Sequence, residues 1–350
     1  MSGLKSRIAK LIAADGPISI AQFMTIALHD SHDGYYATRD PFGARGDFIT
    51  APEVSQMFGE LIGLWLVQCW REQGSPSPAR LVELGPGRGT LMADALRAAR
   101  IVPEFLDAIE IVLVEASPAL REIQRERLSG QKIKWIDHFD SETLSGRSLF
   151  LIANEFFDAL PIRQYVMTER GWCERMVTAR DGELEFVLAP VAAAGLDPGK
   201  AEIGAVYETS PASNALAEEI ARAIAAQGGA ALIVDYGHNG GFGDTLQAVA
   251  KHKYASILDA PGEADLSAHV DFAALAAAAR RGGAKVFGPI GQGSFLTALG
   301  LKERARRLIL DNPDETKAIE AAIDRLTAGM GTLFKAMALL PQGAGKPAGF

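Results

Sequence analysis

LVELGPGRGT, residues 81–90, is the stretch of the sequence that decides the predicted fold. It begins as an apolar strand and continues as a helix, because apolar residues recur at helical spacing over residues 91–99. The turn between the two carries Gly85, Gly87 and Gly89. Glycine is needed where a ligand approaches the backbone without meeting a Cβ atom, and where a tight turn requires positive φ. An ordinary strand-to-helix turn is the alternative, so the choice depends on the residues around the loop.

Acidic residues at the ends of the next two predicted strands indicate the kind of ligand. Glu115 ends the second strand, in VLVEASP, where a carboxylate can accept hydrogen bonds from both hydroxyls of a ribose. Asp137 ends the third strand, in IKWID, and can accept a hydrogen bond from a base amine, although a turn aspartate is an equal alternative. Together with the glycine loop, these residues predict a ligand that contains a nucleoside.

The residues next to the glycines favour one cofactor over another. The loop lacks the G-K-[ST] ending with which nucleoside triphosphatases bind phosphates. Glu83 stands two positions before Gly85, where a carboxylate would repel the pyrophosphate of a dinucleotide but suits the cationic amine of a methionine. The spacing G-x-G-x-G, in place of G-x-G-x-x-G, favours the same choice. The predicted cofactor is S-adenosylmethionine, with NAD as the alternative.

Strand-like and helical segments alternate along the chain after the loop, which predicts an α/β fold with a parallel sheet covered by helices on both faces. A change to polar–apolar alternation over residues 161–190 predicts an antiparallel β insertion. We expect an N-terminal helical region with a lid loop over residues 1–78, the core over 79–341, and a flexible tail rich in Gly and Pro over 342–350. The expected core strands cover residues 80–84, 109–114, 133–136, 149–153, 231–235, 285–287 and 332–339.

Composition excludes several classes of protein. The 350 residues are 48% hydrophobic, yet no apolar run approaches the roughly 18 residues of a membrane-spanning helix. A formal net charge of −8 gives no encouragement to nucleic-acid binding. Cys69 and Cys173 stand far apart, and no pattern of histidines or carboxylates suggests a metal site. Because the N-terminus has no signal-peptide pattern, these features predict a cytoplasmic protein that is not integral to a membrane.

A second polar cluster, NEFFDALP at residues 154–161, follows the fourth predicted strand. We assign Asn154 to the cofactor and Glu155 and Asp158 to catalysis, because groups at the carboxyl end of a parallel strand face the ligand crevice. The alternative is a helix start that Asn154 caps and whose dipole favours the two carboxylates. Capping does not explain the two aromatic residues between them.

The loop over residues 31–52 is dense in Gly, Asp and Pro, and its apolar residues follow neither the helical nor the strand period. Long loops of this kind are typically functional. Its segment GDFITAP supplies Gly46, Asp47 and Thr50, and we predict a lid over the cofactor, with a plain turn as the alternative.

Polar residues after the fifth strand are further candidates. Asp235 and Tyr236 would line the same crevice. His238 and His269 could act as acid or base, since imidazole titrates near neutrality, although a structural hydrogen bond is the commoner use of a histidine.

These motifs together resemble the MidA-like class I S-adenosylmethionine-dependent methyltransferases, a family that includes the mitochondrial complex I assembly factor with protein arginine methyltransferase activity. The similarity runs through DGYYATRDPFGARGDFITAPEVSQMFGE, VELGPGRGTL, NEFFDALP, ALIVDYGH and ADLSAHVDF, over roughly residues 30 to 340. The resemblance implies a Rossmann-like sheet of seven strands, the last antiparallel, with an added N-terminal helical region. It also implies S-adenosylmethionine as cofactor and, as acceptor, an arginine of the 49-kDa-type subunit of NADH dehydrogenase (complex I), methylated during assembly.

Methylation of arginine makes a particular demand, because the guanidinium stays protonated and its lone pairs are delocalised. Glu155 and Asp158 could hold it bidentately and localise its charge away from the attacking nitrogen. An assembly chaperone without catalysis and an NAD-dependent oxidoreductase are the alternatives.

Overall fold

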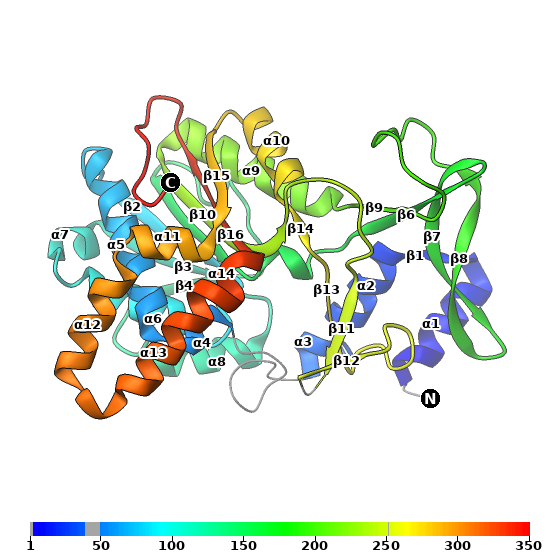
Figure 1. Cartoon of the computed structure of the whole chain (residues 1–350), viewed down its shortest axis with the longest axis horizontal. Coiled ribbons are helices and arrows are strands. Elements are labelled where there is room, and N and C mark those ends of the chain that lie inside the picture. Colours follow the sequence, from blue (N-terminus) through cyan, green and yellow to red (C-terminus); the bar gives the residue numbers. More distant parts are fainter. Residues whose placement is uncertain (1–2, 39–49, 251) are drawn as a thin grey trace. The chain divides into compact units, whose positions relative to one another are not determined.

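The computed structural model describes residues 3–38, 50–250 and 252–350 (Figure 1). The chain divides into two compact units, and each of them is built from three separate segments. Unit 1 comprises Met1–Phe48, Asp158–Ser213 and Gly240–Asp271, and unit 2 comprises Ile49–Phe157, Asn214–Asn239 and Phe272–Phe350.

Unit 2 contains the parallel sheet that the sequence predicts. Six of its strands run in the same direction, and β16 runs antiparallel to both of its neighbours, β10 and β15. The fold prediction of a Rossmann-like sheet whose last strand is antiparallel is therefore confirmed. In sheet order the strands are β15 (Lys285–Gly291), β16 (Phe334–Leu340), β10 (Gly229–His238), β5 (Ser148–Asn154), β2 (Ala79–Leu84), β3 (Ile109–Val114) and β4 (Ile133–Ile136).

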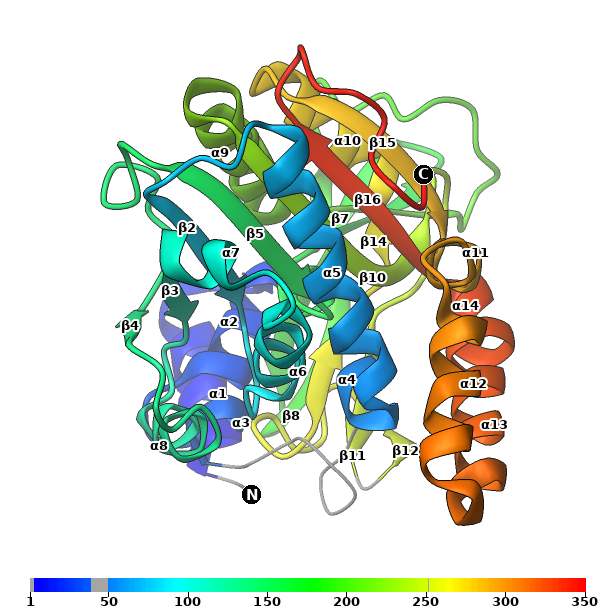
Figure 2. The same ribbon diagram turned by 90° about the vertical axis from the view of Figure 1, so that its left-hand side faces the viewer.

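Helices cover this sheet on both faces. Figure 2 shows α5 crossing one face, with α9 and α10 beyond the sheet on the other side. Within the part of the chain that the structure describes, no helix is both long and apolar enough to cross a membrane. The helices are α4 (Ala51–Val54), α5 (Gln56–Glu72), α6 (Thr90–Ala99), α7 (Pro103–Ala108), α8 (Pro118–Arg127), η1 (Phe157–Ala159), α9 (Pro211–Gln227), α10 (Phe272–Arg281), α11 (Gln292–Ala298), α12 (Leu301–Asp311), η2 (Pro313–Glu315), α13 (Thr316–Asp324), η3 (Arg325–Gly329) and α14 (Met330–Leu333).

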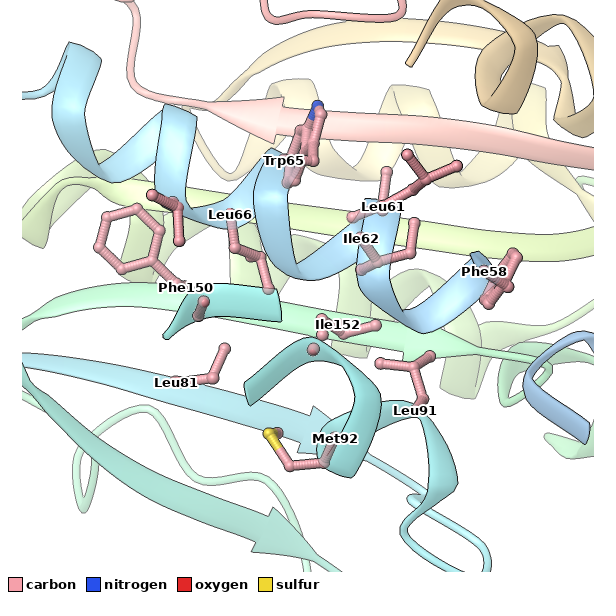
Figure 3. Close-up of a cluster of buried hydrophobic side chains, with 14 of the residues drawn as sticks. Phe58, Leu61, Ile62, Trp65, Leu66, Leu81, Leu91, Met92, Phe150 and Ile152 are labelled. Atoms are coloured by element: carbon pink, nitrogen blue, oxygen red, sulfur yellow. The ribbon is translucent and has the colours of Figure 1, made fainter. Parts of the chain in front are cut away.

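The core of unit 2 lies between α5, α6 and the central strands. Apolar side chains at helical spacing along α5 are fully or almost fully buried against β2, β5 and α6 (Figure 3). The two helices approach closely at Gly63, where a Cβ atom would stand 2.5 Å from the carbonyl oxygen of Ala95. This packing fixes α6, and hence the glycine loop before it, against the sheet. The labelled residues of this cluster are Phe58, Leu61, Ile62, Trp65, Leu66, Leu81, Leu91, Met92, Phe150 and Ile152.

Helix α5 is preceded by a separate short helix, α4, and the two are divided at Ser55. Ser55 has extended backbone angles, φ −163° and ψ 140°, and its Oγ accepts a hydrogen bond from Met57 N–H, so it ends α4 and caps α5. A serine offers its own side chain to the first turn of a helix, which favours a new start at this point.

Unit 1 is built from antiparallel sheets and the N-terminal helices. The helices bury Leu4, Ile8 and Phe23 against Val177 and Leu184 of the β insertion, so the expected N-terminal helical region shares one core with the insertion. Strands β1, β7, β6 and β9 follow one another in one sheet with β8 beside β7, and β12, β11 and β13 form a second. The elements are α1 (Gly3–Asp15), β1 (Ile18–Ser19), α2 (Ile20–His29), α3 (Tyr35–Thr38), β6 (Arg163–Thr168), β7 (Gly171–Arg180), β8 (Glu183–Ala192), β9 (Val206–Thr209), β11 (Gln247–Ala250), β12 (Lys253–Ala255), β13 (Asp265–Ser267) and β14 (Val270–Asp271).

The C-terminal residues 342–350, which we expected to form a flexible tail, make defined contacts within unit 2. Trp65 Nε1 donates to the carbonyl oxygen of Ala348 at 3.0 Å, and the rings of Phe295 and Phe350 stand 5.1 Å apart. Burial of these aromatic groups holds the end of the chain on α5 and α11.

Candidate cofactor site

The glycine loop has the conformation that the sequence predicts for it. Gly85, Gly87 and Gly89 have φ of +58°, +52° and +76°, in the left-handed region that favours glycine. A Cβ atom on Gly85 would stand 2.7 Å from the ring of Phe156. Gly89 N–H donates to the carbonyl oxygen of Pro86 at 2.7 Å, which closes the turn before α6 begins. The backbone therefore favours glycine at all three positions, and at Gly85 the space for a side chain is missing as well.

Glu83 lies at the carboxyl end of β2, directly before this loop. Its side chain is 3% exposed, and its Oε2 atom has no hydrogen-bond partner among the described residues. Burial raises the pKa of this carboxyl to about 8. A buried carboxylate oxygen without a partner is costly, so a cationic donor at this position would be bound with a large gain.

Glu115 is connected to the loop through Gln124, a residue that the sequence reasoning missed. Gln124 Nε2 donates to the carbonyl oxygen of Gly87 at 2.7 Å and to Glu115 Oε2 at 3.2 Å, and its Oε1 accepts from Trp135 Nε1. Glu115 Oε1 accepts from Ser117 N–H at 2.8 Å. Burial raises the pKa of Glu115, and these donors partly oppose that rise. A polar residue on the buried face of α8 was the signal that could have identified Gln124.

Asp137 is much more exposed than Glu115. Its side chain is 75% exposed, and its Oδ1 accepts from an Arg121 guanidinium nitrogen at 2.6 Å. Arg121 Nε also donates to the carbonyl oxygen of Glu115. One arginine therefore connects Glu115 and Asp137, the two residues predicted to bind the nucleoside. The role of Asp137 at the base stays a prediction.

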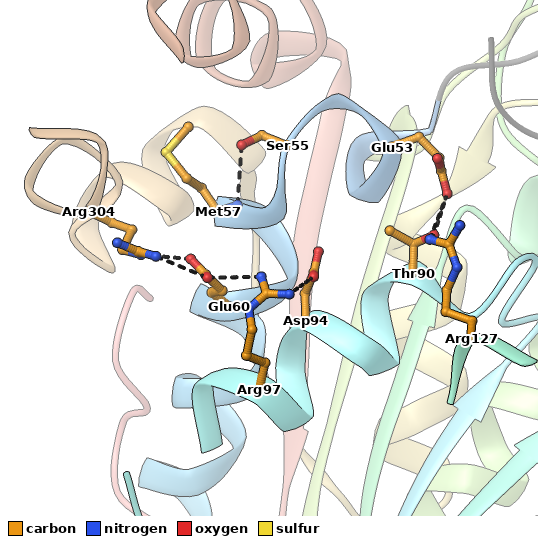
Figure 4. A network of polar contacts seen from close by, with 9 residues as sticks. All are labelled: Glu53, Ser55, Met57, Glu60, Thr90, Asp94, Arg97, Arg127 and Arg304. Atoms are coloured by element: carbon orange, nitrogen blue, oxygen red, sulfur yellow. Dashed lines mark hydrogen bonds and ion pairs between the residues drawn. The ribbon is translucent and has the colours of Figure 1, made fainter. Parts of the chain in front are cut away.

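A polar network joins α4 to the start of α6 (Figure 4). Thr90 Oγ1 donates to Glu53 Oε1 and accepts from an Arg127 guanidinium nitrogen. Thr50, a predicted cofactor residue, is the N-cap of α4, and its carbonyl oxygen accepts from Glu53 and Val54 N–H groups. The sequence reasoning missed Glu53 and Thr90, which fix the segment after Thr50 to the helix that follows the glycine loop. Gly46 and Asp47 lie outside the described residues.

A second network in the same view joins three helices. Glu60 of α5 is almost fully buried and binds Arg304 of α12 at 2.7 Å and Arg97 of α6 at 3.0 Å. Arg97 also binds Asp94 at 2.7 Å. Burial opposes ionisation of Glu60, but the two arginines hold its pKa below its usual range.

Asn154 ends β5 at the same edge of the sheet, and Glu155 follows directly after the strand. Asn154 is 9% exposed, its Oδ1 has no partner among the described residues, and its Nδ2 donates to Glu155 Oε1 at 3.3 Å. Glu155 has φ +50°, a conformation that a residue with a side chain rarely adopts and that often marks a functional site. Its Oε1 also accepts from Ala51 N–H at 2.8 Å. One catalytic candidate therefore also fixes the start of α4.

Asp235 holds the turn that follows β5. It is fully buried, its Oδ2 accepts from the N–H groups of Phe156 and Phe157 at 3.1 and 2.9 Å, and its Oδ1 accepts from Tyr236 N–H. The capping that the alternative interpretation gave to Asn154 is thus supplied by Asp235, from the neighbouring strand.

Asp158, the second catalytic candidate, belongs to unit 1. Its carbonyl oxygen accepts from Ala268 N–H at 3.0 Å. Burial, together with the negative charges of Asp265 and Asp158, raises the pKa of Tyr36 well above its usual value. The carboxylates of Glu155 and Asp158 are thus carried by different units, although three positions separate them in sequence.

The two candidate histidines are also in different units. His269 belongs to unit 1, where its backbone N–H donates to Thr245 Oγ1 at 2.9 Å. His238 ends β10 in unit 2. Over the described ranges, no group of three or more histidine, cysteine or acidic side chains is arranged to hold a metal ion.

A Rossmann-like sheet with an antiparallel last strand, and a glycine loop beside a buried carboxylate, define a class I methyltransferase. The chain belongs to the family described as "Putative S-adenosyl-L-methionine-dependent methyltransferase", whose model matches residues 61–290. Its cofactor is S-adenosylmethionine, as the sequence predicted. The described residues fit this cofactor, because the unpartnered Glu83 oxygen lies beside a loop whose glycines adopt left-handed backbone angles and leave space for a ligand.

Similar proteins of known name support this assignment. The chain is 40% identical to zebrafish (Danio rerio) "Protein arginine methyltransferase NDUFAF7, mitochondrial", covering 89% of this chain and 80% of that protein. It is 38% identical to the human protein of the same name, covering 94% and 81%. A crystal structure of a Burkholderia thailandensis protein bound to S-adenosyl-homocysteine superposes with a TM-score of 0.86, at 29% identity, covering 99% of this chain and 93% of that one.

The same names correct one prediction. We predicted a cytoplasmic protein, but the zebrafish, mouse and human relatives are all named mitochondrial, so the cytoplasmic location is wrong. The error has a simple origin, because composition and cysteine content report a reducing environment and do not distinguish one such compartment from another.

Proposed function

We propose that this methyltransferase transfers the methyl group of S-adenosylmethionine to an arginine side chain of a protein. The observation that carries the proposal is the similarity, over most of both chains, to relatives named protein arginine methyltransferases. The net charge of −8 suits a basic acceptor side chain and its surroundings.

The cofactor residues have complementary tasks in this proposal. Glu83 receives the ammonium of the methionine moiety, and Gly85, Gly87 and Gly89 let the backbone approach it. Glu115, held by Gln124, accepts from the ribose hydroxyls. Asp137 contacts the amine of the base, and Asn154 contacts the methionine moiety of the cofactor. Gly46, Asp47 and Thr50 belong to the predicted lid.

The acceptor arginine needs help because its guanidinium is protonated at every ordinary pH. Bound S-adenosylmethionine supplies an electrophilic methyl group, and this chain has to hold the acceptor nitrogen in line with it and exclude water. Glu155 binds the guanidinium and localises its charge away from the attacking nitrogen, and the same task for Asp158 stays a prediction from the sequence. The strained backbone of Glu155 supports a functional use of this carboxylate.

As acceptor we propose an arginine of the 49-kDa-type subunit of respiratory complex I. The purified subunit is incubated with the enzyme and S-adenosylmethionine that carries a tritiated methyl group. We expect stoichiometric label on one arginine, located by mass spectrometry, and no label when that arginine is replaced by lysine. Tight cofactor binding without any transfer to this subunit would contradict the proposed acceptor, and without transfer to any protein it would favour an assembly role.

A further inference from the structure

Three neighbouring strands of unit 2 end in a buried polar atom that has no hydrogen-bond partner among the described residues. These atoms are Glu83 Oε2 on β2, Asn154 Oδ1 on β5 and His238 Nδ1 on β10. The strands are adjacent and parallel in the order β2, β5, β10, so their carboxyl ends meet at one edge of the sheet. Buried polar atoms are seldom left unpaired, and three at one edge indicate that a ligand satisfies them.

All three side chains are on the same face of the sheet. Side chains alternate along a strand, so each shares a face with the residue two or four positions earlier. Those residues are Leu81, Ile152 and Val234, and all three belong to the core cluster beneath α5. Tyr236, between Val234 and His238, pairs in register with Phe334, and their rings stand 5.5 Å apart, so these two aromatic side chains share a face at the end of β10.

The three residues also differ in how far along the strand direction they lie. Asn154 pairs in register with Val234, and β10 continues four residues further to His238. At the rise of a β-strand, His238 therefore stands about 13 Å beyond that pair along the chain. In the proposed function, Glu83 and Asn154 are accounted for by the methionine end of the cofactor. His238 stands beyond them along the strand direction and is not accounted for by the cofactor.

We propose that His238 contacts the acceptor nitrogen and takes its proton through Nδ1. This inference rests on the proposed methylation of a nitrogen. The neighbouring charged groups have other partners: Glu155 accepts from Ala51 N–H, and Asp235 accepts from three backbone N–H groups on the other face of the sheet. Lys335 of β16 pairs in register with Asp235, on that other face. An imidazole, which titrates near neutrality, suits the removal of a proton.

The step balances in atoms and charge. The acceptor nitrogen forms a bond to the methyl carbon while the carbon–sulfur bond breaks, and the electron pair of that bond stays on sulfur. The nitrogen keeps the electron pair of its N–H bond, and the proton goes to Nδ1. The product is a methylated guanidinium of unchanged charge, and the imidazolium then returns its proton to solvent.

The position of His238 can be tested without any acceptor. NMR titration of the protein with labelled histidine gives the pKa of His238 in the complexes with S-adenosylmethionine and S-adenosyl-homocysteine. Because only the first carries a sulfonium cation, the pKa of His238 should be lower in that complex by at least about half a unit. His138, exposed and four strands away beyond β4, is the internal control and should titrate equally in both. Equal pKa values of His238 in the two complexes would overturn the proposal.

The proton transfer proposed for His238 is tested with the complex I subunit as acceptor. In His238→Gln, kcat should fall by a factor of about 10² to 10⁴ with unchanged affinity for S-adenosylmethionine. In His238→Ala, added imidazoles should restore part of the rate, and more basic imidazoles should restore more. His138→Ala should match the unmodified enzyme. A normal rate in His238→Gln would refute the proton transfer, whereas absence of transfer by the unmodified enzyme would refute the proposed function and leave the NMR result to decide the position.

Discussion

The ends of β2 and β5 lie side by side in one sheet, yet their acidic groups are used differently. At the end of β2, Gly89 N–H closes the turn on Pro86 and Gln124 of α8 binds Gly87, while Glu83 keeps a buried oxygen without a partner among the described residues. At the end of β5 the turn depends on distant segments, because Asp235 and Ala51 bind Phe156, Phe157 and Glu155. The first end is shaped for a ligand before the ligand arrives, while the second combines binding groups with the support of the fold.

The largest effect on cofactor affinity should come from a substitution in the loop at the end of β2. Gly87→Val should weaken S-adenosylmethionine binding more than a thousandfold, because a branched side chain at φ +52° both strains the loop and fills the space of the ligand. Calorimetry on the folded variant measures this loss.

Gly130→Val is the matched control for that change. Gly130 also has positive φ, +88°, but a Cβ atom there would meet nothing within 4 Å. Both variants should lose similar stability, of about 1 to 2 kcal/mol for a left-handed residue with a side chain, and only Gly87→Val should lose the cofactor. Equal affinities would remove the loop from the binding site.

A smaller effect, on rate and not on affinity, should come from the β5 end. Glu155→Gln keeps an oxygen for Ala51 N–H but removes the charge, so methyl transfer should fall by about a hundredfold to a thousandfold, or 3 to 4 kcal/mol, with cofactor affinity retained. Steady-state kinetics and cofactor titration separate the two quantities.

Glu155→Ala, compared with Glu155→Gln, distinguishes the role of the negative charge from the structural role of the side chain at the start of α4. It removes the contact to Ala51 as well, so it should also lower the melting temperature, which Glu155→Gln should not. Transfer at the normal rate by Glu155→Gln would mean that this carboxylate only supports α4.

The smallest effect should come from the nucleoside end. Glu115→Ala should weaken S-adenosylmethionine by about 1.5 to 3 kcal/mol through lost hydrogen bonds to a charged acceptor. Asp137→Ala should cost less than about 1 kcal/mol, because that carboxylate is 75% exposed and already paired with Arg121. Calorimetry on both variants checks the order, and a larger loss at Asp137 would reverse the assignment of these two residues.

The same contrast explains what the sequence could predict. The periods of the strands and the spacing of the glycines are local, so the order of elements and the positions of Glu83, Glu115 and Asn154 at the edge of the sheet could be derived from them. The resemblance added the antiparallel last strand, which no local pattern indicates.

Contacts between distant segments could not be predicted in this way. Nothing near Asp235 indicates that it binds the amides of Phe156 and Phe157, and nothing near Gln124 indicates that it joins Gly87 to Glu115. The N-terminal helices and the β insertion share one core, in which residues more than 150 positions apart in sequence pack together. Local periodicity cannot indicate such contacts.

In the proposed function, the buried carboxyl of Glu83, whose Oε2 has no partner among the described residues, receives the ammonium of the cofactor. In the free protein burial raises the pKa of Glu83 to about 8, so at pH 7 this carboxyl is mostly protonated. A bound cation favours the ionised form and lowers that pKa, so binding at pH 7 must release the proton.

Calorimetric titration with S-adenosylmethionine at pH 7, in two buffers of different ionisation enthalpy, counts the protons released. We expect about one proton from the unmodified protein, since a group with a pKa near 8 is about nine-tenths protonated at pH 7. Glu83→Gln should release none from this position and should bind the cofactor more weakly. Equal proton release by the two proteins would contradict the claim.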